Sequence, residues 1–359
     1  MRRTVITYLL FILAMSGFVA LRIQAGKVMA APAVTAPEPE EAMEETAAYK
    51  EPLPEAESIP VLAPPVTDDR EYLWRGTVEP VSEFDGLIPR IVCWGDSLTV
   101  SLDGQSAYPD ILRKLSGCEV INYGVESENT AMIAMRSGGL RVNVKATVIP
   151  SDTELIPIFL RTENDGHVFF LDNGDAGINP CSINGIEGEL VKLNGAYYFK
   201  RSQKGERIAV DDGTQLKTFG LNDAKPDDVL VIFAGTNDLP DAKSAANIIS
   251  LIRSMIDTAG TDKFIVVGLT YAGGIPEIDR VNEEMGASFG DHFVDIRKYM
   301  LNYGLEDAGI KPTSQDIEDI NMGEIPKSLR NDYVHGNSTY HRLLGEQIYR
   351  RMQYMGYCR

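Results

Sequence analysis

The feature that most limits the fold of this chain is an alternation of short apolar strands with amphipathic helices, running from about residue 88 to the C-terminus. Strands are predicted at 88–94, 119–123, 228–233, 263–268 and 292–296. Helices are predicted at 108–115, 129–136, 245–258, 276–289 and 340–352. Continuous apolar runs such as 228–233 are typical of parallel strands that are buried on both faces. The pattern therefore predicts an α/β fold, a parallel sheet with helices on both faces.

The stretch 139–221 breaks this alternation. Short strand-like runs are predicted there at 140–148, 154–160, 167–171, 189–193 and 196–200. Turn-forming pairs such as Asn184-Gly185 and Asn194-Gly195 separate them. We therefore expect a small β-rich module at 139–221, inserted into a discontinuous α/β domain formed by 76–138 and 222–359.

The N-terminal part, which precedes the α/β domain, is expected to consist of two segments with different roles. Arg2 and Arg3 precede an uncharged, mostly apolar run from Val5 to Leu21, which is typical of a secretory signal. Residues 1–31 are thus predicted to be a signal peptide or a retained membrane anchor. Both alternatives put the folded part outside the cytoplasm, secreted or held at the outer face of the membrane. Residues 32–75 are rich in Pro, Ala and Glu, and we expect a disordered acidic linker.

Charge and cysteine content exclude several classes of function. The formal net charge is −18, which argues against nucleic-acid binding, because phosphate contacts need clustered Lys and Arg. Contact with a membrane is then expected only through the N-terminal segment, if it is uncleaved. The four cysteines are Cys93, Cys118, Cys181 and Cys358. They form no C-x-x-C pair, so no zinc site is expected, and their three conceivable disulfide pairings stay open.

Chemistry-bearing residues follow the predicted strands. Gly95-Asp96-Ser97-Leu98 comes directly after the first strand, at the carboxyl edge of the sheet, where open α/β folds bind ligands. We also expect Ser97 to lie at the start of the next helix, whose N–H groups favour negative charge. Taken alone, this tetrapeptide is equally typical of a turn or a helix cap.

Two further strands end in candidate hydrogen-bond donors. The second strand runs into Asn122-Tyr123-Gly124, and the third into Gly235-Thr236-Asn237-Asp238. The Gly124 backbone N–H and the Asn237 side-chain amide are both candidate donors to an oxyanion.

A serine nucleophile needs a base, and the base needs an orienting group. Asp332 and His335 lie three residues apart near the C-terminus, so one turn could present both. The other histidines are His167 in the insert, His292 at the start of a strand and His341 before a helical pattern. His341 is expected to be a packing or surface residue and is the alternative base.

The ordered set Gly-Asp-Ser-Leu, Asn-x-Gly, Gly-Thr-Asn-Asp and Asp-x-x-His resembles the SGNH (GDSL-type) hydrolases. The resemblance covers about 88–138 and 222–355. It implies a flavodoxin-like three-layer α/β/α fold with a five-stranded parallel sheet. It also implies a serine esterase in which Ser97 is the nucleophile, His335 the base and Asp332 its orienting residue. The implied oxyanion hole comprises the Ser97 N–H, Gly124 and Asn237, without a metal ion or an organic cofactor.

One position departs from the family pattern. Members often carry a second glycine, as in Asn-x-Gly-x-x-Gly, and here that place holds Ser127. The loop after Gly124 can therefore bring side chains such as Glu126 and Glu128 into the cleft. For this reason the substrates of other family members are not assigned to this chain.

Export, a spacer and a β insert favour removal of O-acetyl groups from a cell-envelope or extracellular polysaccharide. A lipase, lysophospholipase or thioesterase is the alternative within the same family. A catalytically silent glycan-binding protein is the alternative outside it.

Overall fold

The computed structural model describes residues 90–100, 106–238, 242–270 and 276–358. The predicted signal or anchor at 1–31 and the predicted linker at 32–75 lie outside these residues. So do residues 76–89, with which the predicted α/β domain begins. In the described ranges, no helix combines the length and apolar character needed to cross a membrane.

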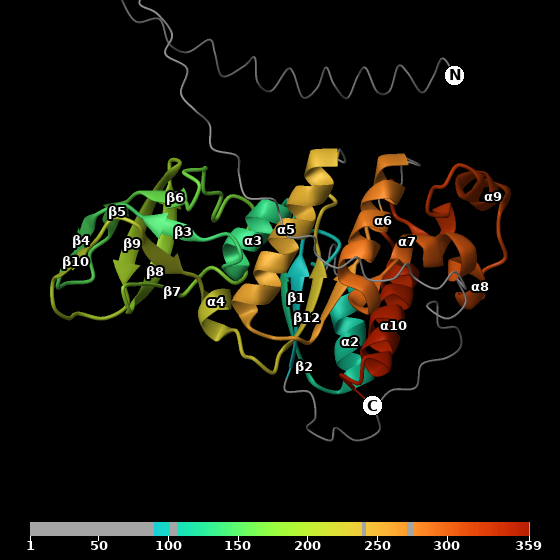
Figure 1. The fold of residues 1–359 in the computed structure, drawn as a ribbon, viewed down its shortest axis with the longest axis horizontal. Coiled ribbons are helices and arrows are strands. Elements are labelled where there is room, and N and C mark those ends of the chain that lie inside the picture. The colour runs from blue at the N-terminus through green and yellow to red at the C-terminus, as the bar shows by residue number, and fades with distance from the viewer. Residues whose placement is uncertain (1–89, 101–105, 239–241, 271–275, 359) are drawn as a thin grey trace, which may run out of the picture. The chain divides into compact units, whose positions relative to one another are not determined.

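A five-stranded, all-parallel sheet forms the centre of the α/β part (Figure 1). Its strands are β1 Arg90–Gly95, β2 Glu119–Gly124, β12 Val229–Phe233, β13 Phe264–Val267 and β14 Phe293–Val294. They lie in the order β14-β13-β12-β1-β2, which is 2-1-3-4-5 in chain order, the order of flavodoxin-like sheets. Each begins and ends within about three residues of its predicted range, because the buried apolar runs mark the strands.

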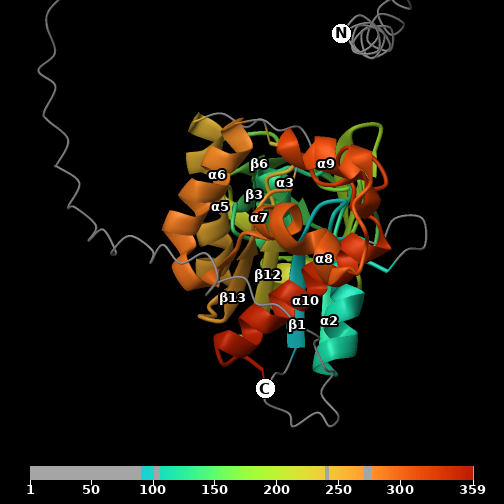
Figure 2. The same cartoon turned by 90° about the vertical axis from the view of Figure 1, so that its right-hand side faces the viewer.

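Five long helices flank this sheet. They are α2 Tyr108–Ser116, α3 Thr130–Ser137, α5 Ala242–Ala259, α6 Pro276–Phe289 and α10 Ser338–Tyr354. Figure 2 shows α5 and α6 on the opposite side of the strands from α2, and α2 packs against α10. Helix α5 buries Ile248, Ile252 and Met255, whose spacing of three to four residues puts them on one face. Helices therefore cover both faces, as predicted.

The chain between β14 and α10 contains short helices that the sequence did not indicate. They are α7 Ile296–Tyr299, a π-helix at Met300–Gly304, α8 Leu305–Asp307, α9 Ser314–Asn321 and a 3₁₀ turn at Lys327–Leu329, while another 3₁₀ turn, Gly290–His292, directly precedes β14. These elements carry the chain to the segment that contains Asp332 and His335.

The β-rich part lies between α3 and α4 Phe219–Asp223 and has its own apolar core. Its strands are β3 Val142–Val144, β4 Thr147–Ile149, β5 Ile156–Ile158, β6 Leu160–Thr162, β7 Cys181–Ile183, β8 Ile186–Leu193, β9 Ala196–Arg201, β10 Ile208–Val210 and β11 Thr214–Lys217. Seven form an antiparallel sheet in the order β5-β9-β8-β7-β11-β3-β6, while β10 pairs with β4. The predicted boundary at 138/139 falls between α3 and β3, and that at 221/222 falls inside α4.

Three predictions about this part were wrong in detail. The range 140–148 is two strands with different partners, β3 in the larger sheet and β4 paired with β10. The range 154–160 contains β5, which pairs with β9, and the first residue of β6, which pairs with β3. The range 167–171 is not a strand. Instead, the hydroxyl of Tyr197 lies 2.8 Å from the Val168 carbonyl and 3.0 Å from that of Phe170. A side chain thus contacts carbonyls that a ladder would otherwise use.

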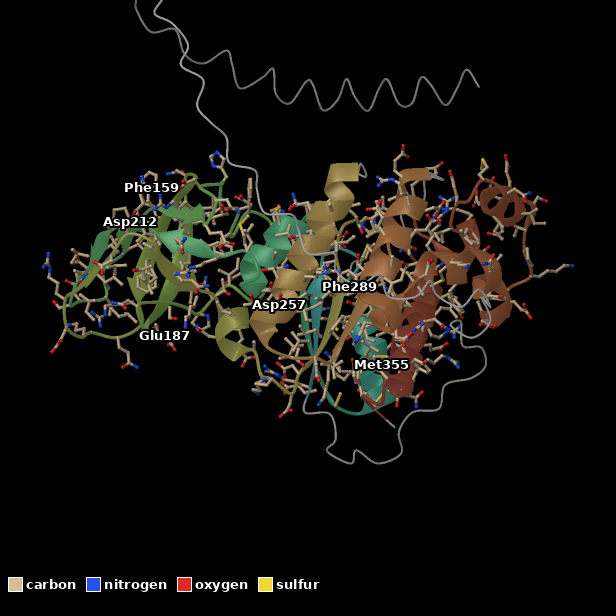
Figure 3. The ribbon with its side chains drawn as sticks, in the orientation of Figure 1. Phe159, Glu187, Asp212, Asp257, Phe289 and Met355 are labelled. Atoms are coloured by element: carbon tan, nitrogen blue, oxygen red, sulfur yellow. The ribbon has the colours of Figure 1, made fainter. Side chains whose placement is uncertain are left out.

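Side chains of β5 and its flanks alternate between the core of the β-rich part and solvent. Ile158 is buried, whereas Leu155, Pro157 and Phe159 are exposed. Phe159 is 75% exposed at the surface (Figure 3). All four cysteines are buried thiols.

Candidate active site

Ser97 lies in a tight turn directly after β1. The Asp96 carbonyl accepts hydrogen bonds from the N–H groups of Thr99 and Val100, at 3.0 and 3.1 Å. A side chain on Gly95 would clash with Thr99, 2.0 Å from an ideal Cβ. The turn therefore needs glycine there. We predicted Ser97 to lie at the start of the next helix, but helix α2 begins only at Tyr108. Ser97 lies instead in a turn that precedes this helix.

Ser97, His335 and Asp332 form one chain of hydrogen bonds. His335 Nε2 lies 2.9 Å from Ser97 Oγ, and His335 Nδ1 lies 2.9 Å from Asp332 Oδ2. Both carboxylate oxygens are used, because Asp332 Oδ1 accepts the N–H groups of Val334 and His335, each at 2.7 Å. The single turn expected from the three-residue spacing thus fixes both the backbone and the ring of His335.

The surroundings keep Asp332 ionised. Burial acts to raise the pKa of Asp332, but hydrogen bonds from the backbone and ring of His335 and from the Val334 N–H outweigh it and hold the pKa below its ordinary value. An ionised Asp332 accepts a hydrogen bond from Nδ1–H of His335, which leaves Nε2 as the acceptor for the Ser97 hydroxyl.

Two buried carboxylates of α9 support this segment from behind. Asp319 Oδ2 accepts the Lys327 N–H at 2.8 Å and Arg330 Nη2 at 2.9 Å, and Asp316 Oδ1 accepts the Ser328 N–H at 2.8 Å. Asp316 and Asp319 are 0% and 1% exposed. Helix α9, which was not predicted from the sequence, therefore holds the segment that bears His335 in place.

Asp96, the neighbour of Ser97, is fully buried. Its Oδ1 accepts the Leu98 N–H at 2.9 Å, whereas its Oδ2 has no hydrogen-bond partner among the described residues. Burial raises the pKa of Asp96 to about 7, against the opposing effect of the Leu98 N–H. The residue directly before Ser97 thus carries a buried carboxyl group whose pKa lies near neutral pH.

Two of the three predicted oxyanion donors are free to act. Within the described ranges, no partner takes the backbone N–H of Ser97. The Asn237 Nδ2 donates one hydrogen to the Glu128 carbonyl at 2.9 Å, and its second hydrogen has no described acceptor. Asn237 is solvent-exposed at the end of the loop after β12.

The third predicted donor, Gly124, is occupied. Its N–H donates to Asn122 Oδ1 at 2.8 Å, while Asn122 Nδ2 donates to the Thr99 carbonyl at 2.9 Å. A Cβ on Gly124 would come 2.4 Å from the Val100 nitrogen. Gly124 is therefore not the free donor predicted; it allows the Ser97 turn to pack against the end of β2, and Asn122 joins the two.

Ser127 offers the free N–H that Gly124 lacks. It is exposed and has φ +62°, a left-handed conformation that usually favours glycine. Its backbone N–H has no partner in the part of the chain that the structure describes. The sequence signal was the family pattern itself, because the place that Ser127 takes often holds glycine.

The remaining histidines lie in other surroundings. His341 is 7% exposed, packs edge-on against Tyr340, and has its pKa lowered to about 4 by burial. His292 stacks on Phe264, with ring centres 3.8 Å apart, and His167 contacts Phe169 in the β-rich part. Of the four histidines, His335 is the one that is hydrogen-bonded to Ser97.

The described residues do not meet the requirements of a metal site. Across the described ranges, no group of three or more His, Cys, Asp and Glu side chains is arranged to hold a metal ion.

Comparison with known proteins gives structural neighbours only. No protein-family model and no curated protein matches the sequence. A protein assigned to the lipolytic G-D-S-L family from Desulfitobacterium hafniense DCB-2 is 13% identical, with 73% of this chain and 99% of that chain covered and a TM-score of 0.40. The acetyl xylan esterase AlAXEase is 11% identical, with 73% and 98% covered and a TM-score of 0.39.

A third neighbour is the lipase/acylhydrolase from Enterococcus faecalis. It is 18% identical, with 75% of this chain and 97% of that chain covered and a TM-score of 0.38. At these scores the similarities assign neither a substrate nor a role to any residue.

Proposed function

We propose that this protein is a serine ester hydrolase that works through an acyl-enzyme. The observation that carries the proposal is the unbroken hydrogen-bond chain from Ser97 Oγ through the His335 ring to Asp332, with 2.9 Å at each step. A hydroxyl, an imidazole and a carboxylate in this order are the parts that acyl transfer by serine requires.

The chemistry follows from these contacts. Ser97 Oγ attacks the ester carbonyl while His335 Nε2 takes the hydroxyl proton, and Asp332 stabilises the imidazolium that forms. The tetrahedral intermediate collapses when Nε2–H protonates the departing alcohol. Water then attacks the acyl-Ser97 ester, with His335 acting again as base, and the acid leaves.

The oxyanion of the intermediate needs donors that are not already used. The free backbone N–H of Ser97, the second hydrogen of Asn237 Nδ2 and the free N–H of Ser127 supply them. Removing one such donor typically lowers kcat about 10²- to 10³-fold. In this proposal Ser127 replaces Gly124, whose N–H is bonded to Asn122.

The proposed substrate is an O-acetyl group on a cell-envelope or extracellular polysaccharide. The exposed residues of the two loops that carry the proposed donors are polar, namely Glu126, Ser127 and Asn237, and suit a small acyl group on a hydrophilic alcohol. Tyr333, between Asp332 and His335, is 67% exposed, with the Arg330 guanidinium 4.9 Å from its ring centre. An exposed aromatic face is a natural contact for a sugar ring. The proposed site of action is outside the cytoplasm, on account of Arg2, Arg3 and the apolar run that follows.

An activity profile with Ser97→Ala as control tests the proposal. Wild-type protein should hydrolyse p-nitrophenyl acetate and release acetate from acetylated oligosaccharides, and Ser97→Ala should do neither. Hydrolysis by Ser97→Ala at the wild-type rate would remove the proposed mechanism. Preference for long acyl chains would instead favour a lipase, lysophospholipase or thioesterase.

A fluorophosphonate probe tests the non-catalytic alternative. Folded wild-type protein should be labelled at Ser97 and the Ser97→Ala variant should not. If folded wild-type protein is not labelled at all, a glycan-binding role becomes the better explanation.

A further inference from the structure

Arg136 of α3 is fully buried and contacts three separate backbone segments. Its Nη1 donates to the carbonyls of Tyr123 at 2.9 Å and Ala176 at 2.7 Å, and its Nη2 lies 3.4 Å from that of Gly95. Tyr123 and Gly95 belong to the carboxyl ends of β2 and β1, and Ala176 to the β-rich part. One guanidinium thus connects two strand ends at the site with the insert.

The charge of Arg136 is balanced by Glu128, which is 3% exposed. Glu128 Oε2 lies 2.7 Å from Arg136 Nε and 2.6 Å from Nη2. A buried ion pair is a weak contributor to stability, because the cost of removing both charges from water offsets their attraction. The pair therefore calls for an explanation other than stability.

The Arg136–Glu128 pair holds the loop that bears the free donor of Ser127. At one end of this loop, the Val125 N–H donates to the Gly95 carbonyl at 3.1 Å. At the other end, the Glu128 side chain is drawn inward to Arg136, while the Glu128 carbonyl accepts Asn237 Nδ2. Ser127 lies between these anchors with φ +62°.

Both loop-borne oxyanion donors depend on the position of Glu128. Ser127 precedes it in the chain, and Asn237 is bonded to its carbonyl. We infer that the Arg136–Glu128 pair is a positioning device for the oxyanion hole, which fixes the 125–129 loop so that the Ser127 and Asn237 donors meet the developing charge. This inference rests on the proposed esterase mechanism.

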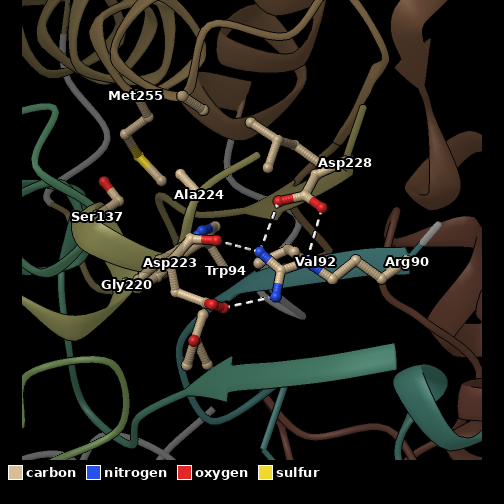
Figure 4. Close-up of a pocket in the computed structure, with 12 residues that line it drawn as sticks. Arg90, Val92, Trp94, Ser137, Gly220, Asp223, Ala224, Asp228 and Met255 are labelled. Atoms are coloured by element: carbon tan, nitrogen blue, oxygen red, sulfur yellow. Dashed lines mark hydrogen bonds and ion pairs between the residues drawn. The ribbon is translucent and has the colours of Figure 1, made fainter. Parts of the chain in front are cut away.

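A second buried pair provides a matched control. At the opposite end of β1, Arg90 Nε donates to Asp228 Oδ1 at 2.7 Å and Nη2 to Asp228 Oδ2 at 2.9 Å, with Asp223 beside them (Figure 4). Arg90 and Asp228 are 4% and 1% exposed. Neutralising Asp228 disturbs the same strand in the same way, but at the amino edge of the sheet.

The experiment compares Glu128→Gln with Asp228→Asn in the full chain. For each variant, thermal unfolding and the kcat and KM for p-nitrophenyl acetate are measured. Both should lower the Tm, but only Glu128→Gln should lower kcat, by about 10- to 100-fold, as expected for partial loss of oxyanion donors. KM should stay within about threefold in both variants. Equal effects of the two variants on kcat would overturn the inference.

A double variant guards against simple loss of folding. Arg136→Met with Glu128→Leu removes both charges, so neither is left buried without its partner, and part of the Tm lost in Glu128→Gln should be recovered. The kcat should stay low, because the carbonyls of Gly95, Tyr123 and Ala176 have lost their common donor. Recovery of kcat together with the Tm would mean that the pair is merely structural. If Ser97→Ala hydrolyses the ester as fast as wild type, the proposed mechanism itself has failed, which is a separate result.

Discussion

Ser97 Oγ lies 2.9 Å from His335 Nε2, although 238 residues separate the two in the chain. The turn after β1 presents the serine, and a segment supported by α9 presents the histidine. Because each side is fixed by its own hydrogen bonds, the contact can be tested one group at a time.

Replacing Asp332 with Asn should lower kcat by about 10²- to 10⁴-fold, with little change in KM. Asn keeps an oxygen that can accept the N–H groups of Val334 and His335, so the turn should survive. Its amide hydrogens, however, would face His335 Nδ1 and favour the tautomer that protonates Nε2. Steady-state kinetics with p-nitrophenyl acetate checks this, and circular dichroism confirms the fold. A variant with wild-type kcat would contradict the assigned role of Asp332.

Replacing His341 with Gln should leave kcat within about threefold of wild type, whereas His335→Gln should abolish measurable activity. His341 is buried against Tyr340, and burial lowers its pKa to about 4, so it is a packing residue. The two variants are compared by hydrolysis rate at pH 7.5. Loss of activity in both, with the fold of each intact, would bring His341 back as a candidate base.

Replacing Ser127 with Gly should keep kcat within about twofold and leave stability unchanged or higher by up to about 1 kcal/mol. Glycine adopts φ +62° without the steric cost of a Cβ and retains the N–H. Ser127→Val should lower kcat at least about tenfold, because β-branched residues resist the left-handed conformation. Kinetics and urea unfolding of both variants check this. Equal activity in the two would show that the Ser127 N–H is not a donor in the reaction.

Replacing Gly124 with Ala should lower kcat/KM at least about tenfold, although the N–H is retained. The new Cβ would lie 2.4 Å from the Val100 nitrogen and 2.8 Å from the Thr99 carbonyl carbon, so the Ser97 turn would have to shift. Gly213→Ala is the control: its φ is +83° but nothing lies within 4 Å, so it should cost stability only. Wild-type kcat/KM in Gly124→Ala would contradict this close packing.

The stability of the fold should depend on pH through Asp96. Burial raises its pKa to about 7 in the folded protein, from 3.8. Between these values the folded protein keeps a proton that the unfolded chain has released, so the free energy of unfolding falls as pH rises, by at most about 1.4 kcal/mol per pH unit. Asp96→Asn has no such proton, so the free energy of unfolding of the variant minus that of wild type should increase from pH 4 to 7. Urea unfolding at four pH values checks this; a difference that is constant with pH would be the opposite result.

The α/β part could be predicted because buried strands leave continuous apolar runs such as 228–233, and because parallel strands bring their carboxyl ends to one edge. That edge brought Ser97 and Asn237 together, the three-residue spacing suggested the Asp332/His335 turn, and the resemblance to SGNH hydrolases implied their roles. The role of Gly124 could not be predicted in the same way. Whether its N–H is free depends on the Asn122 side chain, which bridges to the Thr99 carbonyl only in the folded sheet.

Arg136 carried a signal that was not used. A charged residue in a short helix otherwise rich in Ala, Met and Ile is expected to be paired if it is buried. The prediction of a strand at 167–171 was wrong for another reason. The apolar alternation there is typical of a strand, but the hydroxyl of Tyr197 contacts the carbonyls of Val168 and Phe170. Contacts between a side chain and a distant backbone leave no periodic pattern in a sequence.

The chain enters the β-rich part at the end of α3 and leaves it again close to the end of α3. The Thr218 hydroxyl donates to the Arg136 carbonyl at 2.7 Å, and a Cβ on Gly138 would touch the Leu221 side chain. An inserted segment of about eighty residues thus begins and ends at neighbouring points. Such a segment can be replaced by another, in evolution or in the laboratory, without a change in the surrounding parallel sheet. Because Arg136 also donates to the Ala176 carbonyl inside this segment, a replacement segment would need a carbonyl at the same place to keep that contact.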